Sequence, residues 1–288
     1  MTNTTLQQDN APPAPDRWEP VYNIQPGVPF ADALATGLLQ AYGFKPESLA
    51  NIRILLPTRR ACRILRDTFL RITDGKPLML PAMQALGDID EDELSLEISG
   101  LAGADLELNL PPAIPPLKRQ ILLARELMQS NEFHYSTDQA FALANALGRL
   151  LDQTYTENLD LKNLPSLVKE EGLSDHWQIT VKFLEILSQK WPQILNDIGV
   201  IDQADRRNRL LLALSDYWQA KPAQTPVIAA GSTGSIPATA MLLKTISRMP
   251  KGTVILPGLD PTLDLESRDN IEDTHPQATL YTLLRKME

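Results

Sequence analysis

Hydrophobic and polar positions along the chain follow two periods, and the changes between them outline the predicted elements. Short apolar runs bounded by turn residues indicate buried strands, and apolar residues three to four positions apart indicate amphipathic helices. The predicted strands are Val21–Ile24, Ile52–Leu56, Pro77–Met83, Val227–Ala230 and Thr253–Leu256. Helical patterns follow three of them, over Ala31–Tyr42, from Arg59 to Arg71 and from Pro237 to Arg248. Alternating strands and helices predict an α/β fold with a mostly parallel sheet.

The middle of the chain lacks strand patterns and is predicted to be helical throughout. Four apolar stripes are expected to face a core: Leu117/Ile121/Ala124/Met128, Phe141/Ala144/Leu147/Leu151, Trp177/Val181/Leu184/Leu187/Trp191 and Leu210/Leu214/Tyr217. Ser136 or Thr137 is the expected cap before the second stripe. We therefore predict a disordered arm over 1–20, a discontinuous α/β domain over 21–110 and 221–288, and a helical insertion subdomain over 111–220.

The composition is that of a soluble globular protein, with 43% hydrophobic and 22% charged residues among 288. No apolar run reaches the length of a membrane span, and the N-terminus lacks a signal pattern, so a cytoplasmic location is expected. The single cysteine, Cys62, is expected to be a packing residue in a reducing compartment. The net charge of −9 opposes broad attraction to nucleic acid, so any DNA site must be a local basic surface.

The stretch from Ile52 to Arg71 carries the first candidate site. A buried strand ends at Leu56 and is broken off at Pro57, and Thr58 is the expected cap of a helix whose first turns carry arginine. Helix N-terminal N–H groups backed by arginine bind anions, and phosphate is the obvious anion. The candidate phosphate contacts are Thr58, Arg59, Arg60 and Arg63, with Arg66 and Arg71 further along. The alternative is a solvated helix face beside a sheet.

The loop after the first predicted strand has the setting of a nucleotide-binding P-loop but lacks its residues. A P-loop requires G-x-x-x-x-G-K-[ST], because the lysine meets the phosphates and the hydroxyl holds magnesium. Here Gly27 is the only loop glycine, and Phe30, Ala31 and Asp32 stand where the lysine and hydroxyl residue are needed. We therefore expect an ATPase-like fold that has lost ATP binding at this position.

The turn after the strand Val227–Ala230 is the second candidate phosphate site. It consists of Gly231, Ser232, Thr233, Gly234 and Ser235, and Pro237 is placed to open the next helix. Glycine-rich and hydroxyl-rich turns at the carboxyl end of a parallel strand bind phosphate in many α/β proteins. The alternative is a strand-to-helix turn that needs glycine only for its backbone angles.

Several other charged groups are predicted to be structural. The acidic run from Asp88 to Glu97 is contiguous and lacks a histidine partner, so it is interpreted as a solvated turn. Surface pairs are expected within the cluster Asp202, Asp205, Arg206, Arg207 and Arg209. The histidines His134, His176 and His275 lack a second ligand at metal spacing, so no metal site and no catalytic residue are predicted.

Four segments in this order resemble one protein family. They are VYNIQPGVPFADALATGLL at Val21–Leu39, LLPTRRACRILRDTFL at Leu55–Leu70, LGDIDEDEL at Leu86–Leu94, and VIAAGSTGSIPATAMLLKTI with VILPGLDPTLD from Val227 to Asp264. Together they resemble the N-terminal helicase-like region of AddB, in the form found in alphaproteobacteria. AddB subunits are several times longer, and this chain ends inside a helical pattern at Leu283–Glu288, so an N-terminal fragment is expected.

The resemblance implies a P-loop-NTPase-like fold similar to the first motor domain of superfamily 1 helicases, with its helical insertion. It also implies DNA binding in double-strand break repair and recombination, with the AddA helicase-nuclease subunit as partner. Asp260 resembles the acidic residue at the end of a motor-domain strand, and the acidic run is similar to a signature element of the family.

The family's nuclease domain, its magnesium and its iron–sulfur cluster are implied only for the C-terminal region, so no cofactor is expected here. Asp160-Leu161-Lys162 matches half of a nuclease motif and is interpreted as a chance match. Two alternatives to DNA binding stay open. One is a docking module for the partner helicase subunit, and the other is a small-molecule enzyme with a phosphate site at Gly231–Ser235.

Overall fold

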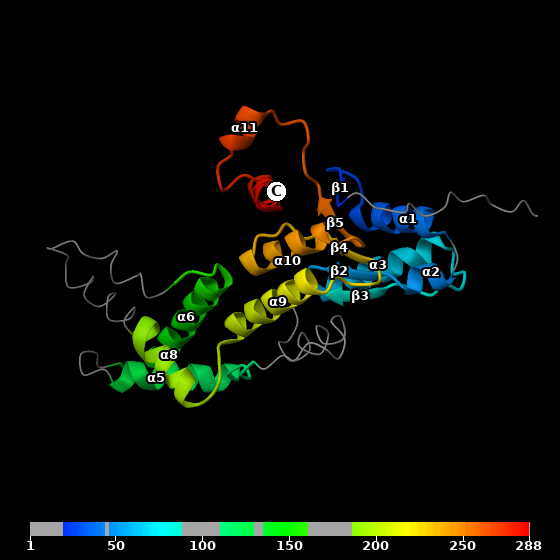
Figure 1. The fold of residues 1–288 in the computed structure, drawn as a ribbon. Helices are drawn as coiled ribbons and strands as arrows, with labels where there is room; N and C mark the ends of the chain where they lie inside the picture. The colour runs from blue at the N-terminus through cyan, green and yellow to red at the C-terminus, as the bar shows by residue number, and fades with distance from the viewer. Residues whose placement is uncertain (1–19, 44–45, 88–109, 130–134, 161–185, 288) are drawn as a thin grey trace, which may run out of the picture. The chain divides into compact units, whose positions relative to one another are not determined.

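The computed structural model describes residues 20–43, 46–87, 110–129, 135–160 and 186–287 (Figure 1). Contacts between residues divide the chain into two compact units. The sheet unit comprises Met1–Asp90, Leu214–Ser235 and Thr239–Glu288, and the helical unit comprises Glu91–Ala213 and Ile236–Ala238. None of the described helices combines the length and apolar character that a membrane-spanning helix needs.

The sheet unit is built on five parallel strands in the order β1-β5-β4-β2-β3. The strands are β1 Val21–Ile24, β2 Arg53–Leu56, β3 Ala82–Ala85, β4 Val227–Ala230 and β5 Gly252–Pro257. Val227 of β4 lies opposite Arg53 of β2 and Gly252 of β5, so β4 is the middle strand of the sheet. The predicted α/β fold is confirmed, and the described sheet is entirely parallel.

Helices cover both faces of this sheet. The helices of this unit are α1 Phe30–Tyr42, α2 Pro46–Ala50, α3 Arg59–Ile72, α10 Pro237–Arg248, α11 Leu265–Asp269, α12 Ala278–Met287 and the C-terminal part of α9 Gln203–Ala220. α1 and α3 pack on each other, and Figure 1 shows them across the strands from α9 and α10. This is what right-handed crossovers require, because the chain moves toward β3 after β1 and β2 and back toward β1 after β3 and β4.

Burial follows the strand order. Every residue of β4 is buried, as is typical of a central strand covered on both faces, whereas the edge strands β1 and β3 are only partly buried. The predicted strand over Pro77–Met83 was placed too early, because β3 begins at Ala82. Its ladder starts where Ala82 donates to the carbonyl of Ile52 and pairs with Arg53, so the partner strand sets the position of β3.

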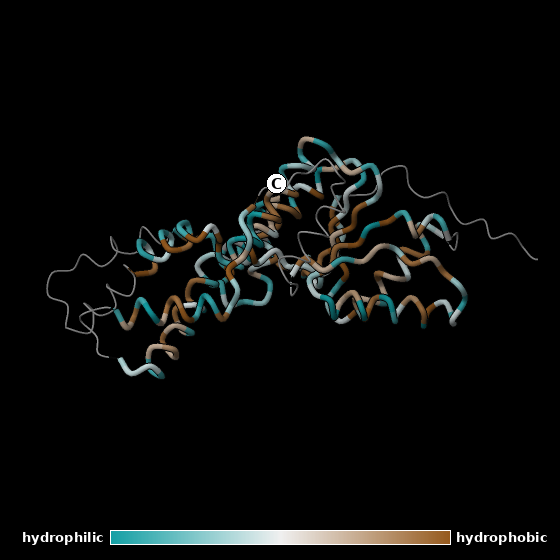
Figure 2. The backbone as a smooth tube through the Cα atoms, turned by 90° about the horizontal axis from the view of Figure 1, so that it is seen from below, coloured by the Kyte–Doolittle hydropathy of each residue, from teal (hydrophilic) through white to brown (hydrophobic). Residues whose placement is uncertain are grey.

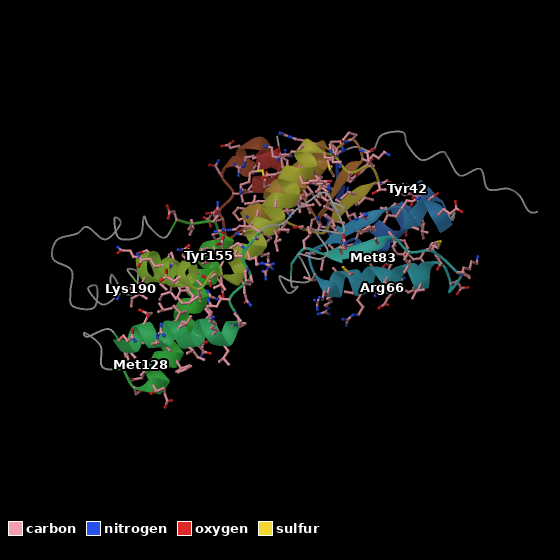
Figure 3. All side chains as sticks on the ribbon, turned by 60° about the horizontal axis from the view of Figure 1, so that its bottom comes forward. Tyr42, Arg66, Met83, Met128, Tyr155 and Lys190 are labelled. Carbon is pink, nitrogen blue, oxygen red and sulfur yellow. The ribbon has the colours of Figure 1, made fainter. Side chains whose placement is uncertain are left out.

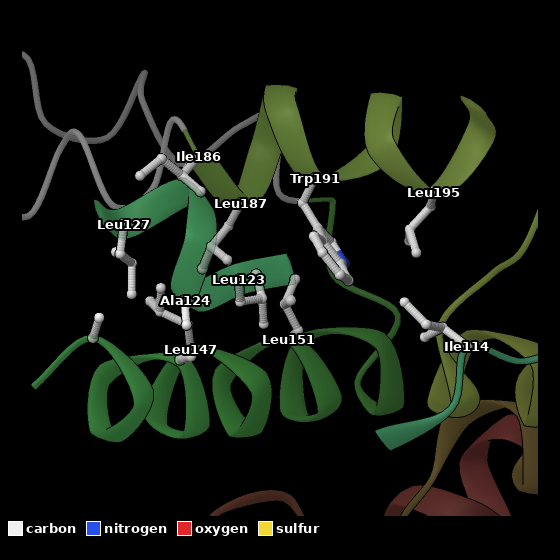
Figure 4. Packing of buried hydrophobic residues seen from close by; sticks show 12 residues of the cluster. Ile114, Leu123, Ala124, Leu127, Leu147, Leu151, Ile186, Leu187, Trp191 and Leu195 are labelled. Atoms are coloured by element: carbon white, nitrogen blue, oxygen red, sulfur yellow. The ribbon is translucent and has the colours of Figure 1, made fainter. Parts of the chain in front are cut away.

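The helical unit has its own core, shown in Figure 4. Its helices are α5 Pro116–Gln129, α6 Thr137–Thr156, the π-helical turn η2 Ile186–Lys190, α8 Trp191–Asp197 and the N-terminal part of α9. Leu187 and Trp191 are fully buried and pack with Leu123 and Leu151 in this cluster. α6 opens with the predicted cap, since Ser136 and Gln139 form a reciprocal capping box. Figure 2 shows hydrophobic and hydrophilic residues alternating along the helices.

One predicted stripe is wrong. Leu117, Ile121 and Met128 of α5 are 64%, 46% and 49% exposed, although Ala124 is buried. The helix instead buries the face that carries Arg119, Leu123 and Leu127. α5 has apolar residues on two faces, and an arginine at the start of the second face conceals it from a pattern based on hydrophobicity.

Arg119 can be buried because two carboxylates compensate its charge. Its Nη1 donates to Asp152 at 2.8 Å, its Nη2 donates to the carbonyl of Gly148 at 2.9 Å, and its Nε lies 2.9 Å from Oδ1 of Asp202. The last contact is an ion pair outside hydrogen-bond angles. The Asp202 side chain is fully buried and accepts a 2.7 Å hydrogen bond from Nε1 of Trp191. Burial raises the pKa of Asp202, and Arg119 offsets part of that rise.

The predicted surface pairing of Asp202 and Arg206 is therefore wrong. Arg206 is also buried, and its Nε donates to the carbonyl of Pro111 at 3.1 Å. Arg209 and Asp205 do form the expected pair on the helix surface, at 2.8 Å. The carboxylate and both buried arginines tie the start of α9 to the elements around it, so these charges belong to the core.

Candidate functional site

The strand order brings the two predicted phosphate sites to neighbouring positions. β2 ends at Leu56, two residues before Thr58, and the adjacent strand β4 ends at Ala230, directly before Gly231. After β2 the chain moves toward β3, and after β4 it moves in the opposite direction toward β5. Open parallel sheets bind ligands at the carboxyl edge where connections diverge in this way. The two candidates thus form one edge of the sheet unit.

Thr58 is the N-cap of α3, as predicted. Its backbone is extended, with φ −142° and ψ 158°, and its Oγ1 accepts a 3.0 Å hydrogen bond from the N–H of Ala61. Any α-helix leaves the N–H groups of its first turn without intrahelical partners. Thr58 uses its hydroxyl for one of them, which makes it a positioning residue for the turn. A phosphate at this end would be held by the remaining N–H groups and by arginine.

The arginines of α3 form a basic face on the helix surface. Arg59, Arg60, Arg63 and Arg66 are all exposed, and their spacing of three and four residues places them along one side. No hydrogen bond or ion pair joins the side chains of Arg60, Arg63 or Arg66 to another described residue. Figure 3 shows Arg66 on the outer side of α3, away from the strand that carries Met83.

Arg71 differs from Arg60, Arg63 and Arg66 because its side chain pairs with a described residue. Its Nη2 lies 2.6 Å from Oδ1 of Asp32 in the first turn of α1, and both side chains are largely exposed. The ion pair joins two helices that pack on the same face of the sheet. Asp32 occupies the region where a P-loop would present a lysine, so an acidic group replaces the cation that meets phosphate.

Two N–H groups of the Gly231–Ser235 turn already donate hydrogen bonds within the protein. Gly231 has φ +77° and donates its N–H to Ile255 of β5 at 2.9 Å, and Gly234 has φ +63° and donates to Oγ of Ser232 at 3.3 Å. A Cβ at Gly234 would lie 2.6 Å from Cδ1 of Leu283. Backbone angles and close packing therefore explain both glycines, and fewer N–H groups are left for an anion than the sequence suggests.

Three loops meet beside Gly231. A Cβ on this residue would lie 3.2 Å from Cε1 of Phe30 and 3.7 Å from Cδ of Pro57. The start of α1, the turn before α3 and the turn after β4 are thus in close proximity at one edge. The Phe30 ring packs where a P-loop would keep an open backbone cradle, so the first loop contributes an apolar contact.

Gly87 is a residue of this edge that the sequence analysis missed. Its N–H donates to the carbonyl of Pro57 at 3.0 Å, and a Cβ at Gly87 would lie 2.9 Å from that oxygen. Gly87 therefore holds the Pro57–Thr58 turn by an approach that a larger residue would prevent. The only signal in the sequence is an isolated glycine four residues after the predicted strand Pro77–Met83.

Asp260 lies after β5, and its side chain and backbone are hydrogen-bonded to residues of the loop and helix that follow. Its Oδ1 accepts hydrogen bonds from the hydroxyl of Thr262 at 2.6 Å and from the Thr262 N–H at 2.9 Å, and these bonds lower the pKa of Asp260. The Asp260 carbonyl accepts a hydrogen bond from the hydroxyl of Tyr281, and its N–H donates to Gln277 at 3.0 Å. Asp260 thus orders the loop before α12.

The remaining candidates are possible metal ligands, the histidines, the acidic run and Cys62. Among the described residues, no group of three or more His, Cys, Asp or Glu side chains is arranged to hold a metal ion. His275 accepts a 3.2 Å hydrogen bond at Nδ1 from the N–H of Gln277. The acidic run Asp88–Glu97 lies outside the described residues, as do His134 and His176. Cys62 is buried in α3, in line with a packing role.

Comparison of the chain with protein-family models and with curated protein sequences found no match.

Proposed function

We propose that this chain is the motor-like N-terminal domain of an AddB-type subunit, and that the basic face of α3 binds the phosphate backbone of single-stranded DNA. The observation that carries the proposal is the row of exposed arginines that begins at the carboxyl edge of the parallel sheet. A parallel sheet with right-handed crossovers and a helical unit encoded between β3 and β4 supports a P-loop-NTPase-like class. The proposal includes a cytoplasmic location and AddA as the partner.

The charges favour a polyanion over a single nucleotide. Arg59 to Arg66 span about 10 Å along the helix at 1.5 Å per residue, which is more than the size of one phosphate. At the β1–α1 loop, Phe30 and Asp32 stand in place of a phosphate-binding lysine. The domain would therefore hold DNA without binding ATP at this loop, and the partner subunit would drive movement.

Fluorescence anisotropy of a labelled single-stranded oligonucleotide tests the proposal on the full chain. The Arg60→Ala/Arg63→Ala variant is compared with Arg125→Ala, which removes one exposed arginine from α5. Each lost phosphate contact should lower the slope of log K against log salt by about 0.7. The slope for the double variant should thus be smaller than the wild-type slope by up to about 1.4. ATP should not change the affinity for the oligonucleotide.

Two results would overturn the proposal. Equal affinity and equal salt dependence for the double variant and wild type would remove the basic face from DNA binding. ATP-dependent binding would show that the β1–α1 loop had been misinterpreted.

The docking alternative is favoured by one observation, the net charge of −9, which opposes the approach of DNA to most of the surface. Absence of DNA binding at low salt, with retention of the AddA subunit in a pull-down by the Arg60→Ala/Arg63→Ala variant, would support this alternative. The small-molecule enzyme is less favoured, since the Gly231 and Gly234 N–H groups already donate within the protein.

A further inference from the structure

A hollow of about 290 Å³ lies in the sheet unit between the C-terminal part of α9 and α10. Its apolar lining comes from Trp218, Pro222, Met241 and Met249. Trp218 is 1% exposed and forms part of the buried wall, whereas Met241 is 44% exposed at the rim. The hollow lies on the sheet face opposite to α3, so it is separate from the proposed DNA surface.

The buried hydroxyl of this hollow, on Thr245, is already satisfied inside the protein. The hydroxyl of Thr245 shares a 2.7 Å hydrogen bond with the hydroxyl of Ser215 and accepts a 3.2 Å hydrogen bond from Nε2 of Gln219. A ligand therefore does not need to complete a buried hydrogen-bond network here. Binding energy would come from apolar contact with the walls and from charge at the rim.

The charge at the rim is positive. Lys244 and Arg248 line the hollow from successive turns of α10, four residues apart on one side of the helix. Arg248 donates to the carbonyl of Met287 at 3.4 Å, and its position in the last turn also suits the helix dipole. No hydrogen bond or ion pair joins the Lys244 side chain to another described residue. In a chain of net charge −9, an apolar hollow with a cationic rim is a local exception.

We propose that this hollow binds an acidic segment of a partner protein, which inserts one large apolar side chain between Trp218 and Met241. Carboxylates on either side of that side chain would meet Lys244 and Arg248. The volume is at the lower limit for a small-molecule pocket and suits a single anchoring side chain, which is how many protein interfaces gain their affinity. The proposal is independent of DNA binding by α3.

The test uses the full chain and a fluorescein-labelled peptide with one phenylalanine flanked by aspartate and glutamate. Lys244→Glu should raise the Kd at least about tenfold, because like charges across an interface are strongly unfavourable. Lys76→Glu is the matched control, since it makes the same charge change at an exposed residue of the sheet unit outside the hollow. That control should change the Kd by less than about twofold.

A second variant distinguishes a loss of peptide binding from a loss of folding. Met241→Glu places a carboxylate at the exposed rim. It should lower the affinity for the peptide while leaving the affinity for DNA unchanged. Replacing the peptide's phenylalanine with serine should weaken binding as well. Equal binding by wild type, Lys244→Glu and Lys76→Glu would overturn the proposal, and so would a lack of binding at millimolar peptide. N-acetylphenylalanine binding as tightly as the peptide would also overturn it, in favour of a small-molecule pocket.

Discussion

Arginine has opposite roles in the two units. In the sheet unit, Arg60 and Arg63 extend from α3 into solvent, and no described residue pairs with their side chains. In the helical unit, Arg119 of α5 is buried against Asp202 and also reaches Asp152. Both helices are amphipathic and of equal length, 14 residues each. The difference lies in the neighbouring elements, which bring carboxylates to Arg119 but leave Arg60 and Arg63 exposed.

The comparison shows where charge is available for function. A buried arginine whose charge is already compensated is committed to its partners, and its loss leaves a buried carboxylate without compensation. An exposed arginine without a partner contributes little to folding, but it can meet an anion at almost no structural cost. This difference supports the proposed binding role of α3 and a structural role for Arg119. Four predictions test this distinction.

Arg119→Met should be the most damaging change. It keeps much of the side-chain length but leaves Asp202 buried without a counter-charge, and breaking a buried pair in this way costs about 3–5 kcal/mol. Urea denaturation followed by circular dichroism measures the loss. Arg125→Met on the same helix is the control, because Arg125 is exposed and should cost less than about 0.5 kcal/mol. Equal losses for the two variants would show that burial does not distinguish these arginines.

Asp202 should give the helical unit a pH dependence. Its pKa is raised in the folded protein, so the folded state binds a proton that the unfolded state has already released. The free energy of unfolding should therefore fall as pH rises from about 4 through the folded pKa of Asp202. Asp202→Asn cannot titrate, and its urea midpoint should lack this decrease. A parallel pH profile for wild type and variant would contradict the assignment.

Thr58→Ala should destabilise the sheet unit by about 1 kcal/mol, because the N–H of Ala61 loses its acceptor. Thr58→Ser keeps the hydroxyl and should remain within a few tenths of a kcal/mol of wild type. Thermal and urea unfolding measure both. If alanine and serine behave alike, the cap contributes nothing to stability, and Thr58 would need another explanation.

Arg60→Ala/Arg63→Ala should change the free energy of unfolding by less than about 0.5 kcal/mol. The same variant is expected to lose affinity for single-stranded DNA, so stability and binding should separate. Arg119→Met, in contrast, is expected to lower the free energy of unfolding. A large loss of stability in the double variant would mean that these side chains have structural partners in solution.

Local patterns identified much of the candidate site. The apolar run, the proline–threonine break and the helical spacing that follows predicted β2, the Thr58 cap and α3. These features depend on backbone preferences and on hydrogen bonds between residues close in sequence. The exposed positions of Arg60 and Arg63 follow from the same periodicity, because the opposite side of α3 carries the buried residues Leu65 and Phe69.

Pairing between distant segments set the features that the sequence did not reveal. The start of β3 at Ala82 depends on its partner Arg53, and the role of Gly87 depends on its approach to Pro57. The orientation of α5 was predicted wrongly, because hydrophobicity cannot indicate that Arg119 has a buried carboxylate to meet. Each of these features requires a contact between residues far apart along the chain.

The sequence determined β1, β2, β4 and β5, the helices α1, α3 and α10, the cap at Thr58 and the row of arginines, since each arises from short-range preferences and periodicity. The tertiary structure alone decided that the turn before α3 lies beside Gly231 and Phe30. It also decided that Lys244 and Arg248 border an apolar hollow, and that Asp202 is buried. The physical reason is that strand order and helix orientation are set by burial and charge compensation over the whole unit, and a linear pattern does not contain them.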